Sequence, residues 1–125
     1  MLPVLSASGV VRAAEPDLTG LRNIASSATP IGPDERRARI ARAQALMKAQ
    51  GIGAMLIESG SSLVYFTGVT WFRSERLTAA ILPVEGEPCI VTPFFEEPSV
   101  RQTLGVAADV RVWQEDEDPL KLVAG

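Results

Sequence analysis

Glycines and prolines divide this chain, from residue 33 onward, into short segments whose apolar pattern alternates between helical and extended. The order of the segments is helix, two strands, a hairpin, a helix and a strand. Helices interleaved with strands bury their apolar faces by packing against a sheet. The pattern therefore predicts an α/β domain, with a mixed, roughly five-stranded sheet flanked by helices.

The first helix is predicted to start at Pro33 and to end at Gly51. Proline suits the first turn of a helix, and Asp34 and Glu35 supply the negative charge that a helix N-terminus favours. The helix has an apolar stripe and many basic residues, which is typical of a surface helix. Nucleic-acid binding through the basic face is the alternative. The apolar stripe is Ile40, Ala43, Leu46 and Met47, and the basic residues are Arg36, Arg37, Arg39, Arg42 and Lys48.

Two strands are predicted next. Residues 54–57 are a short apolar run, which is typical of a strand buried on both faces. Residues 63–67 form a second apolar run that ends at Gly68, and they are interpreted as another strand.

A hairpin follows, because residues 77–84 and 88–92 flank the turn sequence Glu85-Gly86-Glu87. Pro83 and Pro88 place this hairpin toward an edge of the sheet. The remaining predicted elements are a helix over 94–104, a strand over 110–113 and a helix start at 117–119.

The amino-acid composition of the chain argues against two classes of function. The 125 residues, 46% of them hydrophobic, suffice for one core but not for two ordinary domains. Twelve Lys and Arg against fifteen Asp and Glu give a net charge of −3, which argues against binding nucleic acid by covering its phosphates. No apolar run reaches the roughly 20 residues of a membrane-spanning helix. We therefore expect neither a nucleic-acid nor a membrane partner.

Residues that commonly carry chemistry are scarce. The chain has no histidine, so it lacks the commonest general base and metal ligand, and we expect no autonomous catalysis. A single cysteine, Cys89, forms no intramolecular disulfide and no cysteine-based zinc site, and it is interpreted as a small core residue. We expect no catalytic residue, no metal site and no cofactor within this chain.

Residues 1–32 differ from the rest, because they are rich in Ala, Ser, Pro and Gly and show no sustained period. Residues 11–15 resemble the cleavage site of a secretory signal, so residues 1–14 are interpreted as the end of an export signal. A strap-like N-terminal extension is the alternative, and both export and a cytoplasmic location stay open. Few residues follow the helix start at 117–119, so we expect the domain at 33–125 to be cut from a longer chain.

Three segments together resemble one known family. Residues 39–47 supply an arginine-bearing helix, residues 51–57 a glycine-containing turn and a buried strand, and residues 63–68 an aromatic segment ending in Tyr-x-Ser/Thr-Gly. In this order and spacing they resemble the N-terminal domain of the creatinase, prolidase and aminopeptidase P family, the pita-bread metallopeptidases. The resemblance extends over residues 34–125.

This resemblance implies a two-domain enzyme whose larger C-terminal domain holds two divalent metals, often manganese, on two Asp, one His and two Glu residues. A metal-bridged hydroxide in that domain attacks the carbonyl before a proline nitrogen. The resemblance thus implies that this chain is the non-catalytic N-terminal domain of an Xaa-Pro dipeptidase or aminopeptidase. The domain is expected to serve oligomerisation and substrate gating. The full protein is expected to be a homo-oligomer that acts on proline-containing peptides. The alternative is a free-standing α/β binding module for a small carboxylate or a protein partner.

The candidate site is the loop at residues 69–76. The resemblance implies that this loop reaches the active site of a partner subunit, and that Arg76 takes the position of a carboxylate-binding arginine, with Arg73 as the alternative. Trp71 and Phe72 offer contact area, and a guanidinium holds a carboxylate through two parallel hydrogen bonds. In the competing interpretation, both aromatics tuck under the sheet, and Arg73, Glu75 and Arg76 form solvated surface pairs.

Other polar and aromatic residues suggest structural roles. Glu96 and Glu97 are adjacent, so they make a poor acid/base or metal pair and suit a helix N-terminus. The acidic residues 115–118 are interpreted as a solvated turn that caps the following helix. Weak cation binding is the alternative. Trp113 is expected in the core or at an interdomain contact, and Tyr65 in the sheet with its hydroxyl satisfied.

Overall fold

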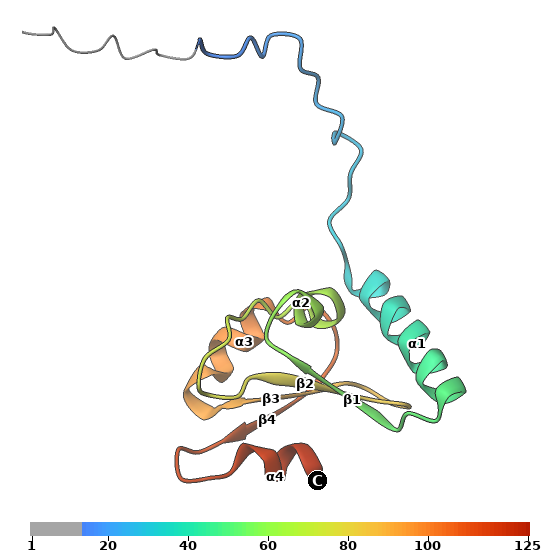
Figure 1. Ribbon diagram of the computed structural model, residues 1–125, viewed down its shortest axis with the longest axis vertical. Helices are drawn as coiled ribbons and strands as arrows, with labels where there is room; N and C mark the ends of the chain where they lie inside the picture. Colours follow the sequence, from blue (N-terminus) through green and yellow to red (C-terminus); the bar gives the residue numbers. More distant parts are fainter. Residues whose placement is uncertain (1–13) are drawn as a thin grey trace, which may run out of the picture.

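The computed structural model describes residues 14–125, so most of the predicted export signal lies outside the described part. Residues 14–32 contain turns but no helix or strand, and they run away from the body of the molecule (Figure 1). The body consists of α1 (Pro33–Gln50), β1 (Ala54–Glu58), α2 (Ser61–Thr67), β2 (Ala79–Pro83), β3 (Cys89–Pro93), the 3-10 helix η1 (Phe94–Glu96), α3 (Glu97–Thr103), β4 (Asp109–Trp113) and α4 (Pro119–Ala124).

The strands form one mixed sheet in the order β1-β2-β3-β4. The first two pairings are antiparallel, and β3 runs parallel to β4. This architecture confirms the predicted α/β class. The described residues contain four strands rather than about five, because the segment predicted as the second strand is helix α2.

The buried residues of helix α2 follow a helical spacing rather than the alternation of a strand. Leu63 and Thr67 lie four residues apart and are both buried, whereas Tyr65 between them is exposed. The helix ends at Gly68, whose φ of 83° is left-handed. The prediction that Tyr65 packs in the sheet is therefore wrong. Its ring lies 4.2 Å from the guanidinium carbon of Arg39 instead.

The hairpin strands β2 and β3 lie at the centre of the sheet, so their predicted edge position is wrong. Pairing between them starts at Ile81 and Cys89, and Pro83 lies beyond that point, where its missing N–H interrupts no hydrogen bond to β3. Strand β1 is an edge strand and is not buried on both faces. Of its residues, only Ile57 is buried.

The core lies between one face of the sheet and helices α1, α2 and α3, while α4 lies against the other face (Figure 1). Ile40 and Met47 from α1, Leu63 from α2 and Val100 from α3 are among the buried members. The helix start predicted at residues 117–119 is confirmed, since the Asp118 carboxylate accepts a hydrogen bond from the Leu120 N–H at 3.0 Å. None of the helices described in residues 14–125 has the length and apolarity needed to cross a membrane.

Candidate functional site

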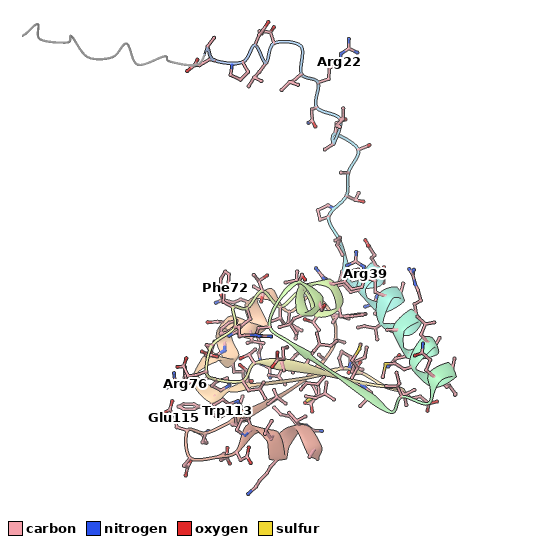
Figure 2. The ribbon with its side chains drawn as sticks, in the orientation of Figure 1. Arg22, Arg39, Phe72, Arg76, Trp113 and Glu115 are labelled. Carbon is pink, nitrogen blue, oxygen red and sulfur yellow. The ribbon has the colours of Figure 1, made fainter. Side chains whose placement is uncertain are left out.

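The loop at residues 69–76 connects α2 to β2 and is anchored at its start. Val69 is fully buried, and its N–H donates to Thr67 Oγ1 at 3.1 Å. Trp71 is partly buried against the core, whereas Phe72 is 86% exposed. The two neighbouring aromatic residues therefore differ. Trp71 packs against the core. Phe72 projects from the body of the molecule (Figure 2).

The far end of the loop is held by the last residue of β4. The indole Nε1 of Trp113 donates to the carbonyl of Leu77 at 3.1 Å, and Trp113 is buried. Thr78, just before β2, forms a buried hydrogen bond of 2.9 Å with Thr92. Helix α2 thus fixes the start of the loop, and residues of β3 and β4 fix its end, while its middle is exposed.

Arg73 and Arg76 make different contacts. Arg73 donates to Glu58 at 2.6 Å, and its side chain is 75% exposed. The side chain of Arg76 is less exposed than that of Arg73. Its guanidinium lies 3.1 Å from the Glu115 carboxylate and 3.3 Å from the Glu75 carboxylate. Its guanidinium carbon also lies 5.4 Å from the centre of the Phe95 ring, within the range of a cation–π interaction. In Figure 2, Arg76 and Glu115 lie near Trp113 at one end of the sheet.

These contacts combine parts of both sequence-based interpretations. Trp71 packs inward and the arginines form ion pairs, as the structural interpretation predicts, while Phe72 projects as the binding interpretation predicts. A cavity of about 30 Å³ lies between Arg73 and Arg76, which is room for a water molecule but not for a peptide. Within this chain the loop is therefore an open surface rather than an enclosed pocket.

The other residues singled out from the sequence have structural partners. Glu96 accepts a hydrogen bond from Thr78 Oγ1 at 3.3 Å, and Glu97 pairs with Arg101 one turn along α3. Glu117 accepts from the Gln114 N–H at 2.6 Å. Within residues 14–125, no three Asp, Glu, Cys or His side chains come together as a metal site.

The sequence did not reveal that Arg36 and Arg39 stabilise α2. Arg36 donates to the carbonyls of Val64 and Tyr65, and Arg39 donates to that of Tyr65 at 2.9 Å. Cationic groups at these carbonyls oppose the negative end of the helix dipole. The available signal was their spacing of three residues, which puts both on one face of α1. Both guanidinium groups are bound by backbone carbonyls of this chain, so these two arginines do not belong to an open basic face.

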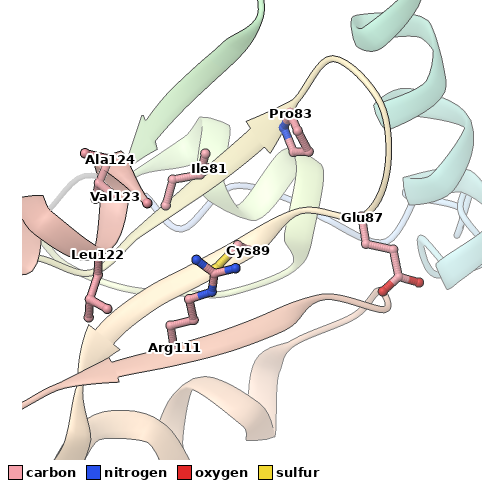
Figure 3. Close-up of a pocket in the computed structure, with 9 residues that line it drawn as sticks. Ile81, Pro83, Glu87, Cys89, Arg111, Leu122, Val123 and Ala124 are labelled. Carbon is pink, nitrogen blue, oxygen red and sulfur yellow. The ribbon is translucent and has the colours of Figure 1, made fainter.

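A second concave region lies between α4 and the sheet (Figure 3). Its volume is about 320 Å³, and Ile81, Cys89 and Leu122 are among its lining residues. Partial burial raises the pKa of the Cys89 thiol. The nearby Arg111 is already bonded to Asp109 at 3.0 Å. Cys89 is thus a partly buried thiol that lines this hollow and lies outside the core cluster, so its prediction as a core residue is wrong.

The helix-flanked mixed sheet and its anchored loop define an α/β domain of a known type. The Creatinase/Prolidase N-terminal domain family matches residues 39–125. The chain belongs to this family, which confirms the resemblance drawn from the motifs.

Named relatives agree with this assignment. The "Probable dipeptidase PepE" of Mycobacterium tuberculosis is 34% identical over 88 residues, which cover 69% of this chain and 24% of that protein. The same name, identity and coverage apply to a Mycobacterium bovis relative. The chain thus spans about a quarter of the length of the curated relatives it matches.

Solved structures show the same fold. Dipeptidase PepE from Mycobacterium ulcerans has a TM-score of 0.68 and 31% identity, covering 77% of this chain and 26% of its own. A prolidase from Thermococcus sibiricus has a TM-score of 0.62 and 29% identity, covering 77% of this chain and 25% of its own. The N-terminal domain of an X-Pro dipeptidase from Streptococcus pyogenes has a TM-score of 0.61 and 16% identity, covering 69% of this chain and 64% of its own. At this identity the likeness shows the fold alone.

Proposed function

We propose that this chain is the non-catalytic N-terminal domain of an Xaa-Pro dipeptidase-like metallohydrolase, and that it serves assembly and substrate gating. The family assignment and the dipeptidase and prolidase relatives support this function. The proposal includes the division of the chain into an extension at residues 1–32 and the domain at 33–125. Its substrate class is a proline-containing peptide, and its assembly is a homo-oligomer.

The metal chemistry of this proposal belongs to a catalytic domain outside these residues. Within residues 14–125 no group of three metal-ligating side chains occurs, so the residues present do not fit a dinuclear metal site. Acidic side chains near the loop are engaged by arginines, as in the pairs Glu58–Arg73 and Glu115–Arg76. We therefore assign the two divalent metals to the catalytic domain. The family resemblance implies that these metals are manganese.

The gating role rests chiefly on the exposure of Phe72. An aromatic side chain that is 86% exposed, on a loop held at both ends, is poised to bury its ring against another surface. Arg73 lies beside it with most of its side chain in solvent. Together these two residues present an aromatic ring and a guanidinium to whatever approaches the loop.

The guanidinium supplies recognition of a substrate carboxylate. Arg76 is already oriented by Glu115 and by the ring of Phe95, so binding would cost little conformational entropy. Arg73 is more exposed and reaches further from the body. In either case the substrate carboxylate replaces a surface carboxylate as the partner, and such surface pairs contribute little stability.

The test compares substrates with and without the carboxylate, using the polypeptide in which this domain is joined to its catalytic domain. We expect Arg76→Gln or Arg73→Gln to raise KM for an Xaa-Pro dipeptide by on the order of 10- to 100-fold, the value of a charge-assisted hydrogen bond. The C-terminally amidated dipeptide should be cleaved equally by wild type and variant. Arg101→Gln, which removes the Arg101–Glu97 pair on α3, is the matched control. Wild-type kinetics in both loop variants would refute the gating role.

A further inference from the structure

A hollow lies between β1 and the start of α2, and we call it the β1–α2 hollow. Its volume is about 380 Å³, which is within the range of small-molecule sites. The turn at residues 59–62 forms part of its wall, and the Ser59 hydroxyl donates to the Thr78 carbonyl at 2.9 Å. Arg73 of the candidate loop also lines it. The hollow thus brings this loop together with two elements of the body.

Part of the lining of this hollow is apolar. Met55 and Ile57 lie two residues apart on β1, so their side chains point to the same face of the sheet. Phe66 of α2 lines the hollow with them. Ile57 is a buried core residue, and Met55 and Phe66 pack against the core. An apolar group of a ligand would therefore leave water for a surface that the fold holds in place.

The charged part of the lining is one ion pair. Arg73 Nη2 donates to the Glu58 carboxylate at 2.6 Å, which uses one of the five N–H donors of the guanidinium. The Arg73 side chain is 75% exposed and that of Glu58 is 55% exposed. Exposed pairs of this kind contribute little stability, so both groups can take other partners at little cost. The hydroxyls of Ser61 and Ser62 add further donors to the same lining.

We propose that the β1–α2 hollow binds a free α-amino acid with an apolar side chain. The Arg73 guanidinium takes the ligand's carboxylate, and the Glu58 carboxylate takes its ammonium group. The side chain of the ligand packs against Met55, Ile57 and Phe66. Binding exchanges the internal ion pair for two charge-assisted contacts with the ligand and adds no net charge.

A free amino acid matches the charges of this hollow better than an ion of one sign. A carboxylate alone would take Arg73 from Glu58 and put two negative charges side by side, and an amine alone would leave the guanidinium without a partner. A zwitterion gives each group an oppositely charged partner. The site lies within this chain and goes beyond the function proposed above. Dipeptide hydrolysis releases free amino acids, so the ligand is a reaction product if that function holds, and this last step alone rests on it.

The direct test is an NMR titration of the 125-residue chain. Leucine should shift the backbone amide signals of residues 58–62 and the Nε–H signal of Arg73. N-acetylleucine and leucinamide each lack one of the two charges, and they should bind on the order of tenfold more weakly than leucine, the value of one charge-assisted hydrogen bond. Glycine should also bind roughly tenfold more weakly, because it lacks the apolar side chain.

Variants of the ion pair give a second readout. Arg73→Gln and Glu58→Gln should each raise the Kd for leucine on the order of tenfold. With N-acetylleucine the two variants should differ in sign: Arg73→Gln weakens binding, whereas Glu58→Gln tightens it by about two- to fivefold, because the competing carboxylate is gone. Arg101→Gln and Glu97→Gln, which break an ion pair on α3 outside the hollow, are the matched controls and should change neither Kd. Circular dichroism checks that each variant is folded.

Other outcomes would overturn the inference. Equal affinity of the wild-type chain for leucine and N-acetylleucine would show that the ammonium group makes no contact with Glu58. If Arg76→Gln rather than Arg73→Gln abolishes binding, the ligand lies at the other end of the loop. Absence of shifts in the hollow at the highest soluble concentration of leucine would mean that it is no amino-acid site. None of these results decides the dipeptide assay, which tests the proposed function separately through KM in the polypeptide that contains the catalytic domain.

Discussion

Substituting Gly68 tests how the candidate loop is attached to the body. Gly68 ends α2 and has a φ of 83°, a left-handed conformation that costs other residues about 1–2 kcal/mol. A Cβ at this position would also lie 2.9 Å from the carbonyl oxygen of Thr103 and 3.0 Å from the amide nitrogen of Gly105. Both contacts are to backbone atoms, so no rotamer change relieves them.

The expected cost of Gly68→Ala is the sum of these two effects. Overpacking of this kind costs about 1–3 kcal/mol, which with the conformational cost gives about 2–5 kcal/mol. Gly51 is the matched control, because its φ of 70° is similar and a Cβ there would meet nothing within 4 Å. Gly51→Ala should therefore cost only about 1–2 kcal/mol.

The measurement is urea unfolding of wild type and both variants, with the free energies of unfolding compared at equal m-values. The Gly68 variant should be the less stable of the two by about 1–3 kcal/mol. Equal destabilisation of both variants would show that the close approach of Gly68 to the segment after α3 is wrong.

Three further predictions concern buried polar groups. Thr67→Val leaves the Val69 N–H without its acceptor and should lower the free energy of unfolding by about 1–3 kcal/mol in urea titrations; no change would mean that this bond is absent. Trp113→Phe removes the bond to the Leu77 carbonyl and should cost about 1–3 kcal/mol, with wild-type stability as the contradicting result. Because burial raises the pKa of Cys89 and lowers its thiolate fraction at a given pH, iodoacetamide at pH 8 should alkylate it more slowly in the folded chain than in urea, and equal rates would contradict this.

The chain's local signals predicted most of the fold. Pro33 and Gly51 bound α1 as expected, and the Glu85-Gly86-Glu87 turn joins β2 and β3. These signals work because they act through the backbone of neighbouring residues.

The error at residues 63–67 has a tertiary cause. A run of Leu, Val, Tyr, Phe and Thr is rich in residues that favour strands, and local propensity alone does not predict a helix there. The helix is stabilised by Arg36 and Arg39, which are more than 20 residues away in sequence and bond its last carbonyls. A single sequence does not show such a long-range contact.

The edges of the sheet were misjudged for a related reason. An apolar run such as residues 54–57 is equally typical of a buried strand and of an edge strand covered on one face. Strand order depends on pairings between distant segments, and those pairings put β1 outside and the hairpin in the middle. The candidate loop was located from its position after Gly68, but the contact of Arg76 with Glu115 joins segments that only the fold brings together.

We propose that this domain serves an Xaa-Pro peptidase without catalysing the reaction itself. The most direct measurement is hydrolysis of an Xaa-Pro dipeptide with Mn²⁺, by the natural gene product that contains this domain and by the 125-residue chain alone. We predict metal-dependent cleavage by the gene product and none by the chain alone. Cleavage by the isolated chain, or a gene product that leaves Xaa-Pro peptides intact with the metal present, would contradict this proposed function.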